Sequence, residues 1–331
     1  VSPLCLKTPK QRMATTTTTL PAAAFWRKGV EPDESRVPRK EPLRLETLND
    51  DDEEEDLDVA TLRKRVEDQE EELWLTSSDS KFYGRWSLQG ASPFARKEGV
   101  VLVPGHPSLS VPGQTDPQDA NSRLLLTIAA ECHTQKVPTL RFDYRGVGKS
   151  FGSFDATTCV RDVVSAIRHC CGASGPFTNA TVVAVSFGSA QTLGNLYTTG
   201  CHKFVSISHG LGLGSTKPDG SRRAPVVQTE DLAPLYNRTN IFFTTLRITT
   251  PKLWIVGEKD ALTDGDELRT FLSHYSPGRG HLSTLLTVPG AAHDMRGHEA
   301  RLARHVLNWI ASSTPLAFHL DFASGNQTQS L

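Results

Sequence analysis

The chain has 331 residues, with 36 Lys and Arg against 37 Asp and Glu, and a net charge of −1 at pH 7. A charge so close to zero argues against binding nucleic acid or an anionic membrane through a global basic field. A membrane-spanning helix needs about 18 consecutive apolar residues, and no segment of this sequence approaches that length. Six cysteines are too few for a disulfide scaffold in a chain of this length.

Residues 1–70 differ in composition from the rest of the chain. Residues 50–56 are seven consecutive carboxylates, and residues 67–72 add five more. Such like-charge blocks repel themselves and have little apolar surface to bury, so they predict a disordered acidic extension. A basic protein is the candidate partner for this extension, and a merely solvated tail is the alternative. Residues 57–66 could form a short charged helix.

The opening of the chain bears on where the protein resides. Residues 1–30 contain five basic residues and no acid, which faintly resembles a mitochondrial transit peptide. A secretory signal needs an apolar core of about 7–15 residues, and no such core stands here. We therefore expect an intracellular, cytoplasmic protein, with the mitochondrion as the alternative.

From residue 71 to residue 315 the sequence alternates between strand and helix patterns. This rhythm predicts an α/β domain with a doubly wound, mostly parallel sheet. Residues 210–250 break the rhythm, as either a lid over the site or a surface loop, and residues 316–331 form a C-terminal tail. Strands are expected near 72–76, 82–88, 99–103, 137–143, 180–185, 203–207, 252–256 and 283–288, and helices near 124–132, 160–170, 188–197, 266–274 and 298–310.

The first candidate site residue is Ser186, in the sequence Ala184-Val-Ser-Phe-Gly188. An apolar strand runs into this segment and a helix follows it. A serine on such a sharp turn is presented at the carboxyl edge of the sheet, provided that the flanking residues are small. Gly188 meets this requirement, and Ala184 stands where glycine is usual. An ordinary turn with a serine cap is the alternative.

Two further strand ends carry the groups that a nucleophilic serine needs. Asp260 follows an apolar strand in the sequence Gly257-Glu-Lys-Asp, and His293 follows another in Pro289-Gly-Ala-Ala-His. A serine hydroxyl needs a base, and the base needs an orienting acid. The chain order Ser, Asp, His is the order of the α/β-hydrolase triad. Asp264 is the poorer fallback for the acid.

These segments resemble the α/β-hydrolase superfamily, close to its dienelactone-hydrolase-like and serine-aminopeptidase-like branch, over about residues 97–312. The run Arg141-Phe-Asp-Tyr-Arg-Gly-Val-Gly-Lys-Ser-Phe-Gly-Ser-Phe-Asp155 also resembles the strand and loop before the nucleophile in that branch. The resemblance implies hydrolysis of an ester, or less readily an amide or peptide bond, through an acyl-enzyme. It places the two backbone donors of the oxyanion hole at Phe187 and His106, because Pro107 has no N–H.

No cofactor or metal is expected. His293 and His298 are five residues apart, with no cluster of cysteines or carboxylates nearby at the spacing of metal ligands. The expected partner is a small-molecule or acyl substrate. Two alternatives stay open: a catalytically inactive α/β-hydrolase fold that serves as an interaction platform, and an acyltransferase that uses the same triad.

Overall fold

The computed structural model describes residues 43–44, 57–88, 97–107, 122–171, 175–193, 195–209, 250–263 and 283–312, with a few positions between 265 and 272. All of them belong to one compact unit, Glu41–Leu331. The predicted tail at 316–331 and nearly all of the predicted lid at 210–250 lie outside the described residues, as does most of the predicted helix at 266–274. The same holds for the acidic extension up to residue 56, apart from residues 43–44.

Nine strands form one sheet, and helices cover both of its faces. The strands are β1 (Leu43–Arg44), β2 (Glu71–Thr76), β3 (Lys81–Ser87), β4 (Lys97–Val103), β5 (Thr139–Phe142), β6 (Phe177–Val185), β7 (Lys203–Ile207), β8 (Lys252–Gly257) and β9 (Ser283–Val288). The helices are α1 (Val59–Glu67), α2 (Arg123–Thr134), α3 (Cys159–Cys171), α4 (Phe187–Leu193), α5 (Leu196–Thr199) and α8 (Glu299–Ala311).

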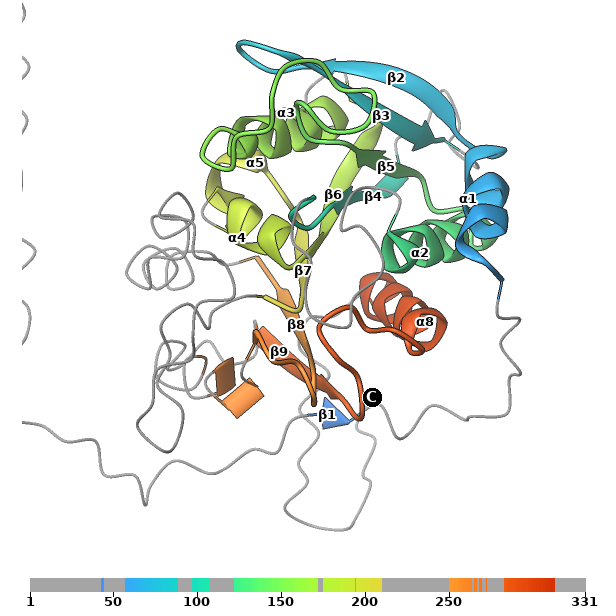
Figure 1. The fold of residues 1–331 in the computed structure, drawn as a ribbon, viewed down its shortest axis with the longest axis vertical. Coiled ribbons are helices and arrows are strands. Elements are labelled where there is room, and N and C mark those ends of the chain that lie inside the picture. The colour runs from blue at the N-terminus through green and yellow to red at the C-terminus, as the bar shows by residue number, and fades with distance from the viewer. Residues whose placement is uncertain are drawn as a thin grey trace, which may run out of the picture. The chain divides into compact units, whose positions relative to one another are not determined.

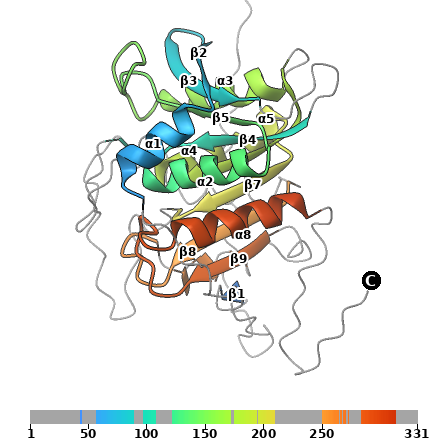
Figure 2. The same ribbon diagram turned by 90° about the vertical axis from the view of Figure 1, so that its right-hand side faces the viewer.

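The sheet has the order β1-β9-β8-β7-β6-β4-β5-β3-β2. Neighbouring strands are parallel from β1 through β5, and only the β3–β5 and β2–β3 pairs are antiparallel. Helices α3, α4 and α5 lie on one face of the sheet, and α1, α2 and α8 lie on the other (Figures 1 and 2). The predicted doubly wound, mostly parallel α/β fold is confirmed.

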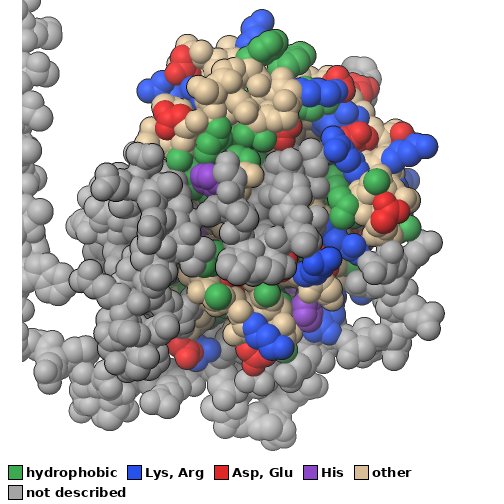
Figure 3. All heavy atoms as spheres, in the orientation of Figure 1, with side chains coloured by type: hydrophobic (Ala, Val, Ile, Leu, Met, Phe, Trp, Pro, Cys, Tyr) green, Lys and Arg blue, Asp and Glu red, His purple; other side chains and the backbone are tan. Residues whose placement is uncertain are grey.

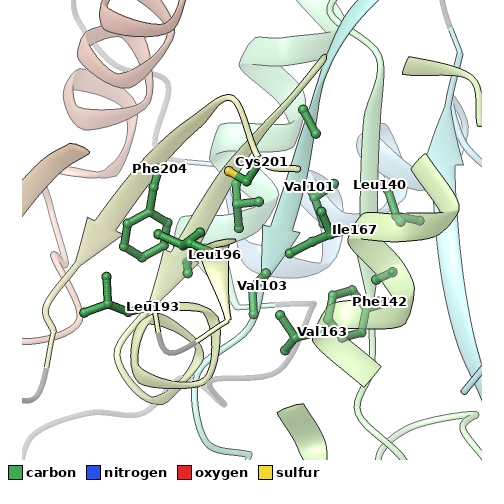
Figure 4. Packing of buried hydrophobic residues seen from close by; sticks show 14 of the residues in the cluster. Val101, Val103, Leu140, Phe142, Val163, Ile167, Leu193, Leu196, Cys201 and Phe204 are labelled. Carbon is green, nitrogen blue, oxygen red and sulfur yellow. The ribbon is translucent and has the colours of Figure 1, made fainter. Parts of the chain in front are cut away.

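Apolar residues of the central strands supply both cores, because successive side chains point to opposite faces. On β6, Val182 and Ala184 belong to the core under α3 and α4, whereas Val183 and Val185 belong to the core under α2 and α8. Figure 4 shows the first of these cores, where side chains of several strands meet those of α3 and α4. A strand buried on both faces reads as a continuous apolar run, as β4 and β6 do.

The short helix offered by residues 57–66 is present as α1, and it is part of the domain. Asp58 caps its start by accepting the N–H groups of Ala60 and Thr61. Leu62 and Val66, four residues apart on one face, are buried against the core under α2 and α8. This packing contradicts the assignment of residues 57–70 to a disordered extension, because two apolar side chains offset the charge of the segment.

The single helix predicted at residues 188–197 is wrong. Helix α4 ends at Leu193, and α5 begins at Leu196. The N–H of Asn195 donates to the carbonyl of Thr192 in a turn tighter than an α-helix, and the φ of Asn195 is −125°, outside the helical range. Apolar spacing alone does not reveal such a break, since Leu193 and Leu196 are both buried.

Basic and acidic side chains of the described residues are intermixed on the face shown in Figure 3. The exposed ion pairs of the described residues include Lys149–Glu72 and Arg161–Asp79. Within the ranges that the structure describes, no helix is both long and apolar enough to cross a membrane.

Candidate active site

Ser186 lies at the sharp turn between β6 and α4. Its φ is +49°, in the left-handed region that a residue with a Cβ rarely adopts. Its N–H donates to the carbonyl of Ile207 at 2.8 Å, which extends the β6–β7 ladder by one residue. Strained residues of this kind cluster at functional sites. The turn thus presents the Ser186 hydroxyl at the carboxyl edge of the sheet.

The turn closes because Gly188 lies directly against the loop after β4. A Cβ at this position would stand 2.3 Å from the carbonyl oxygen of Pro104 and 2.9 Å from Cγ1 of Val103. Ala184, on the other side of the serine, is buried, and its carbonyl accepts the Ser189 hydroxyl at 2.7 Å. The methyl group of alanine is therefore tolerated where glycine is usual, but not at Gly188.

Replacing Gly188 by Ala is expected to displace the turn and to lower kcat/KM by about 100-fold for any reaction at Ser186. An error of about 1 Å in a reacting group has an effect of this order. Gly265→Ala is the matched control, because its Cβ would meet nothing closer than Cγ1 of Val256 at 3.4 Å. Steady-state kinetics of the two variants would test this. Equal activity of both would show that the close approach at Gly188 is not needed.

The structure brings Ser186, His293 and Asp260 together. Nε2 of His293 lies 2.9 Å from Oγ of Ser186, and Nδ1 of His293 lies 2.9 Å from each carboxylate oxygen of Asp260. All three residues are at least 93% buried. The hydroxyl, the imidazole and the carboxylate thus form one continuous hydrogen-bonded chain.

Asp260 is held as a carboxylate. Burial raises its pKa, but the hydrogen bond from His293 and the hydrogen bonds from the N–H groups of Thr263 and Leu262 outweigh burial and lower the pKa below its usual value. Those two N–H groups both donate to Oδ1, at 2.8 Å from Leu262 and 2.9 Å from Thr263. The carboxylate is therefore fixed by its own turn and faces the imidazole.

The histidine turn is held from two directions. Gly257, the last residue of β8, lies so close to it that a Cβ would stand 2.4 Å from the carbonyl of Ala291. Ser208, at the end of β7, donates its hydroxyl to the carbonyl of His293 at 2.7 Å. The sequence analysis missed Ser208. Its only signal was its position just after a buried strand, at the edge where Ser186 and Asp260 also lie.

The side-chain rings of Phe187 and His106, the two residues predicted to supply the oxyanion donors, are in contact. Phe187 is the first residue of α4, where the backbone N–H has no partner within the helix. The ring of His106 packs edge-on against the rings of Phe187 and Phe154, with centroids 5.1 Å and 4.9 Å away. The Tyr144 hydroxyl anchors the same loop by donating to the carbonyl of Pro104. His106 is thus no merely solvated turn residue, and residues 108–111 lie outside the described residues.

Burial lowers the pKa of His106 to about 4. In the unfolded chain its pKa is about 6.5, so between these values the unfolded state binds a proton that the folded state does not. The free energy of unfolding therefore falls as pH drops through this window. We expect the loss of thermal stability between ~pH 7 and ~pH 5 to be smaller in His106→Gln than in the wild type. His202→Gln, at an exposed histidine, is the control. Identical slopes for the wild type and His106→Gln would contradict the neutral state of the half-buried His106.

Arg145 and Asp155 stabilise the loop before α3. The guanidinium of Arg145 pairs with Asp162 at 2.6 Å and with Asp79 at 3.0 Å. Asp155 accepts the N–H and the hydroxyl of Thr157, both at 2.8 Å. The role of Asp162, which is fully buried in α3, was not predicted.

The described residues contain no group of three or more His, Cys, Asp and Glu side chains that could hold a metal ion. Asp264, the fallback acid, lies outside them. Burial raises the pKa of the Cys170 thiol well above its usual value, which is typical of an inert thiol.

No family model and no curated protein matches the chain. Solved structures do. A putative alpha/beta hydrolase from Agrobacterium tumefaciens is 18% identical, with a TM-score of 0.53 over 72% of this chain and 94% of that one. An a/b serine hydrolase without lid from Xanthomonas campestris is 15% identical, with a TM-score of 0.52 over 74% and 97%. Est1E from Butyrivibrio proteoclasticus, in complex with ferulic acid, is 15% identical, with a TM-score of 0.55 over 72% and 97%. The chain therefore has the α/β-hydrolase fold.

Proposed function

We propose that the protein is a serine hydrolase that cleaves a carboxylic ester through an acyl-enzyme on Ser186. The observation that carries this proposal is the hydrogen-bonded chain from Ser186 through His293 to Asp260, which starts at a serine in the left-handed conformation. A structural serine needs neither this backbone strain nor a buried imidazole and carboxylate behind it.

In the first step, Oγ of Ser186 attacks the ester carbonyl while Nε2 of His293 takes the hydroxyl proton. Asp260 accepts the Nδ1–H of His293, which leaves Nε2 free to act as the base and stabilises the imidazolium that forms. The imidazolium then gives its proton to the departing alkoxide. The C–O bond to the alcohol breaks, and the acyl group stays on Ser186.

In the second step, water takes the place of the alcohol. His293 removes a proton from the water, the resulting hydroxide attacks the acyl carbonyl, and the proton returns to Oγ of Ser186 as the acid leaves. The negative oxygen formed in each step is assigned to the backbone N–H groups of Phe187 and His106. Removing one hydrogen-bond donor that faces the developing negative charge typically lowers the reaction rate by about 10²–10³-fold.

An ester is the substrate class that the comparisons favour over an amide. The Pyrococcus furiosus protein with this fold is named an esterase, at 17% identity and a TM-score of 0.55. An alkoxide is also a better leaving group than an amide nitrogen, so ester cleavage demands less of the general acid.

The decisive experiment is labelling of the purified full chain with a fluorophosphonate probe, comparing the wild type with Ser186→Ala. We expect the wild type to be labelled and the variant to be unlabelled, because only an activated serine attacks the phosphorus atom. Ser189→Ala is the control, since this serine also lies in the turn but its hydroxyl donates to Ala184. A folded wild type without label would contradict the proposal.

A further inference from the structure

Three buried polar side chains near Ser186 have no hydrogen-bond partner among the described residues. They are Ser206 on β7, His209 just after β7, and Trp254 on β8, and each has 0% of its surface exposed. Within the part of the chain that the structure describes, Oγ of Ser206, both ring nitrogens of His209 and Nε1 of Trp254 are unpaired. Most buried polar groups are paired, so a group of unpaired ones calls for an explanation. We call these three residues the polar cluster.

The three residues are neighbours. Ser206 and Trp254 are register partners on the parallel strands β7 and β8, so their side chains emerge on the same face. The ring of His209 meets the ring of Trp254 edge-on, with the centroids 5.4 Å apart. Trp254 therefore links the other two members, and the four unpaired atoms share one region of the sheet.

This region borders the proposed site. Ser206 is the register partner of Ala184, which stands two residues, or about 7 Å of strand, before Ser186. At the other end, His209 follows Ser208, whose hydroxyl holds the carbonyl of His293. The polar cluster thus lies on the α4 side of the sheet, on and just after the two strands that follow β6 in the sheet order.

The surroundings of the polar cluster are apolar. Trp254 belongs to the core that also contains Phe204, Phe187 and Leu193, and the Phe204 ring packs edge-on against it. Figure 4 shows Phe204 and Leu193 in this core. Burial lowers the pKa of His209 to about 3, and no charged group contributes to this shift, so the imidazole is neutral. The cluster therefore does not suit an ionic ligand.

The chemistry of the three side chains selects a ligand atom. The indole N–H of Trp254 can only donate, the neutral imidazole of His209 donates from one nitrogen, and the Ser206 hydroxyl can rotate to donate. Each of the three can therefore donate a hydrogen bond to an acceptor oxygen. A ketone oxygen, or a hydroxyl oxygen used as an acceptor, meets this requirement without carrying a charge into the core.

Resting on the proposed esterase function, we propose that Ser206, His209 and Trp254 form a subsite for an uncharged acceptor oxygen in an otherwise apolar acyl group. The alcohol must leave and water must enter between the two chemical steps. A fully buried subsite therefore suits the acyl group, which stays bonded to Ser186 throughout. Because the atoms are fully buried, neighbouring side chains must shift to admit the oxygen, as side chains at binding sites commonly do.

The test compares p-nitrophenyl esters of an unbranched six-carbon acid with the same esters carrying one ketone group at carbon 4 or carbon 5, where the ketone does not activate the ester carbonyl. In the wild type we expect at least one ketone position to raise kcat/KM about tenfold over the plain ester. Ser206→Ala combined with His209→Leu should bring this ratio close to one, chiefly through a higher KM for the ketone ester. Thr181→Val, at a buried threonine five residues before Ser186 on β6, should keep the wild-type ratio.

A second measurement separates a ligand subsite from a site for a structural water. Without substrate, Ser206→Ala removes a buried hydroxyl that has no partner, so its Tm should stay equal or rise. A lower Tm, or a ratio near one for every ketone position in the wild type, would overturn the inference. In that case, turnover of the plain esters would still support the proposed esterase function. If no ester were turned over, both the esterase function and the subsite would be contradicted.

Discussion

Replacing Asp260 by Asn is expected to lower kcat by about 10⁴-fold in a protein that still folds. The reason is that one carboxylate oxygen of Asp260 already accepts two backbone hydrogen bonds. Oδ1 accepts the N–H groups of Leu262 and Thr263, so the oxygen of an asparagine amide must take this place and its NH2 group must take the place of Oδ2. That NH2 group would donate to Nδ1 of His293. Nε2 would then carry the ring proton and could no longer accept the proton of Ser186.

Asp294→Asn is the matched control for this prediction. It removes the same charge from the residue next to His293, but its carboxylate accepts the N–H of Arg296 rather than the imidazole. We expect its kcat to stay within about threefold of the wild type, as for a charge outside the hydrogen-bonded chain. Both variants would be assayed with p-nitrophenyl esters, and their folding checked by circular dichroism. Wild-type turnover in Asp260→Asn would mean that another residue orients the histidine.

The neighbourhood of Ser186, Asp260 and His293 could be predicted because each follows a buried strand. The carboxyl ends of parallel strands meet at one edge of the sheet. Three strand ends with these residue types are therefore brought close together by the topology alone, whatever the length of the loops between them. The apolar runs that mark the strands are local in the sequence, so the prediction needed no knowledge of contacts.

The residues that hold this site could not be predicted, because their partners are far away in the sequence. The hydroxyl of Ser208 meets a carbonyl 85 residues later, and nothing in its local pattern points there. Distant partners also explain why the predicted acidic extension was drawn too long, to residue 70. Charge density over residues 67–72 suggests a solvated segment, but Glu70 pairs with Arg141, 71 residues away.

Replacing Glu70 by Gln is expected to lower the free energy of unfolding by about 3 kcal/mol. The Glu70 side chain is fully buried, and its carboxylate lies 2.7 Å from Nη2 of Arg141 and 3.2 Å from Nε of Arg85. Removing this charge leaves two guanidinium groups, 2% and 13% exposed, without their shared buried partner. Native domains are stable by only about 5–15 kcal/mol, so this is a large fraction of the total. Nη2 of Arg141 also lies 3.6 Å from a carboxylate oxygen of Glu67, so Arg141 keeps one acidic partner in the variant. The expected loss of unfolding free energy is therefore at the lower end of the range for a broken buried ion pair.

Glu72→Gln is the control, because it removes the same charge from the same strand region. The Glu72 side chain is 51% exposed, its partner Lys149 is 60% exposed, and only its second partner, Arg85, is largely buried. Exposed pairs contribute about 0–1 kcal/mol, so urea unfolding should separate the two variants clearly. Combining Glu70→Gln with Arg141→Met should restore part of the loss, since it removes one of the two stranded charges. Equal stability of the two single variants would show that Glu70 is solvated like Glu72.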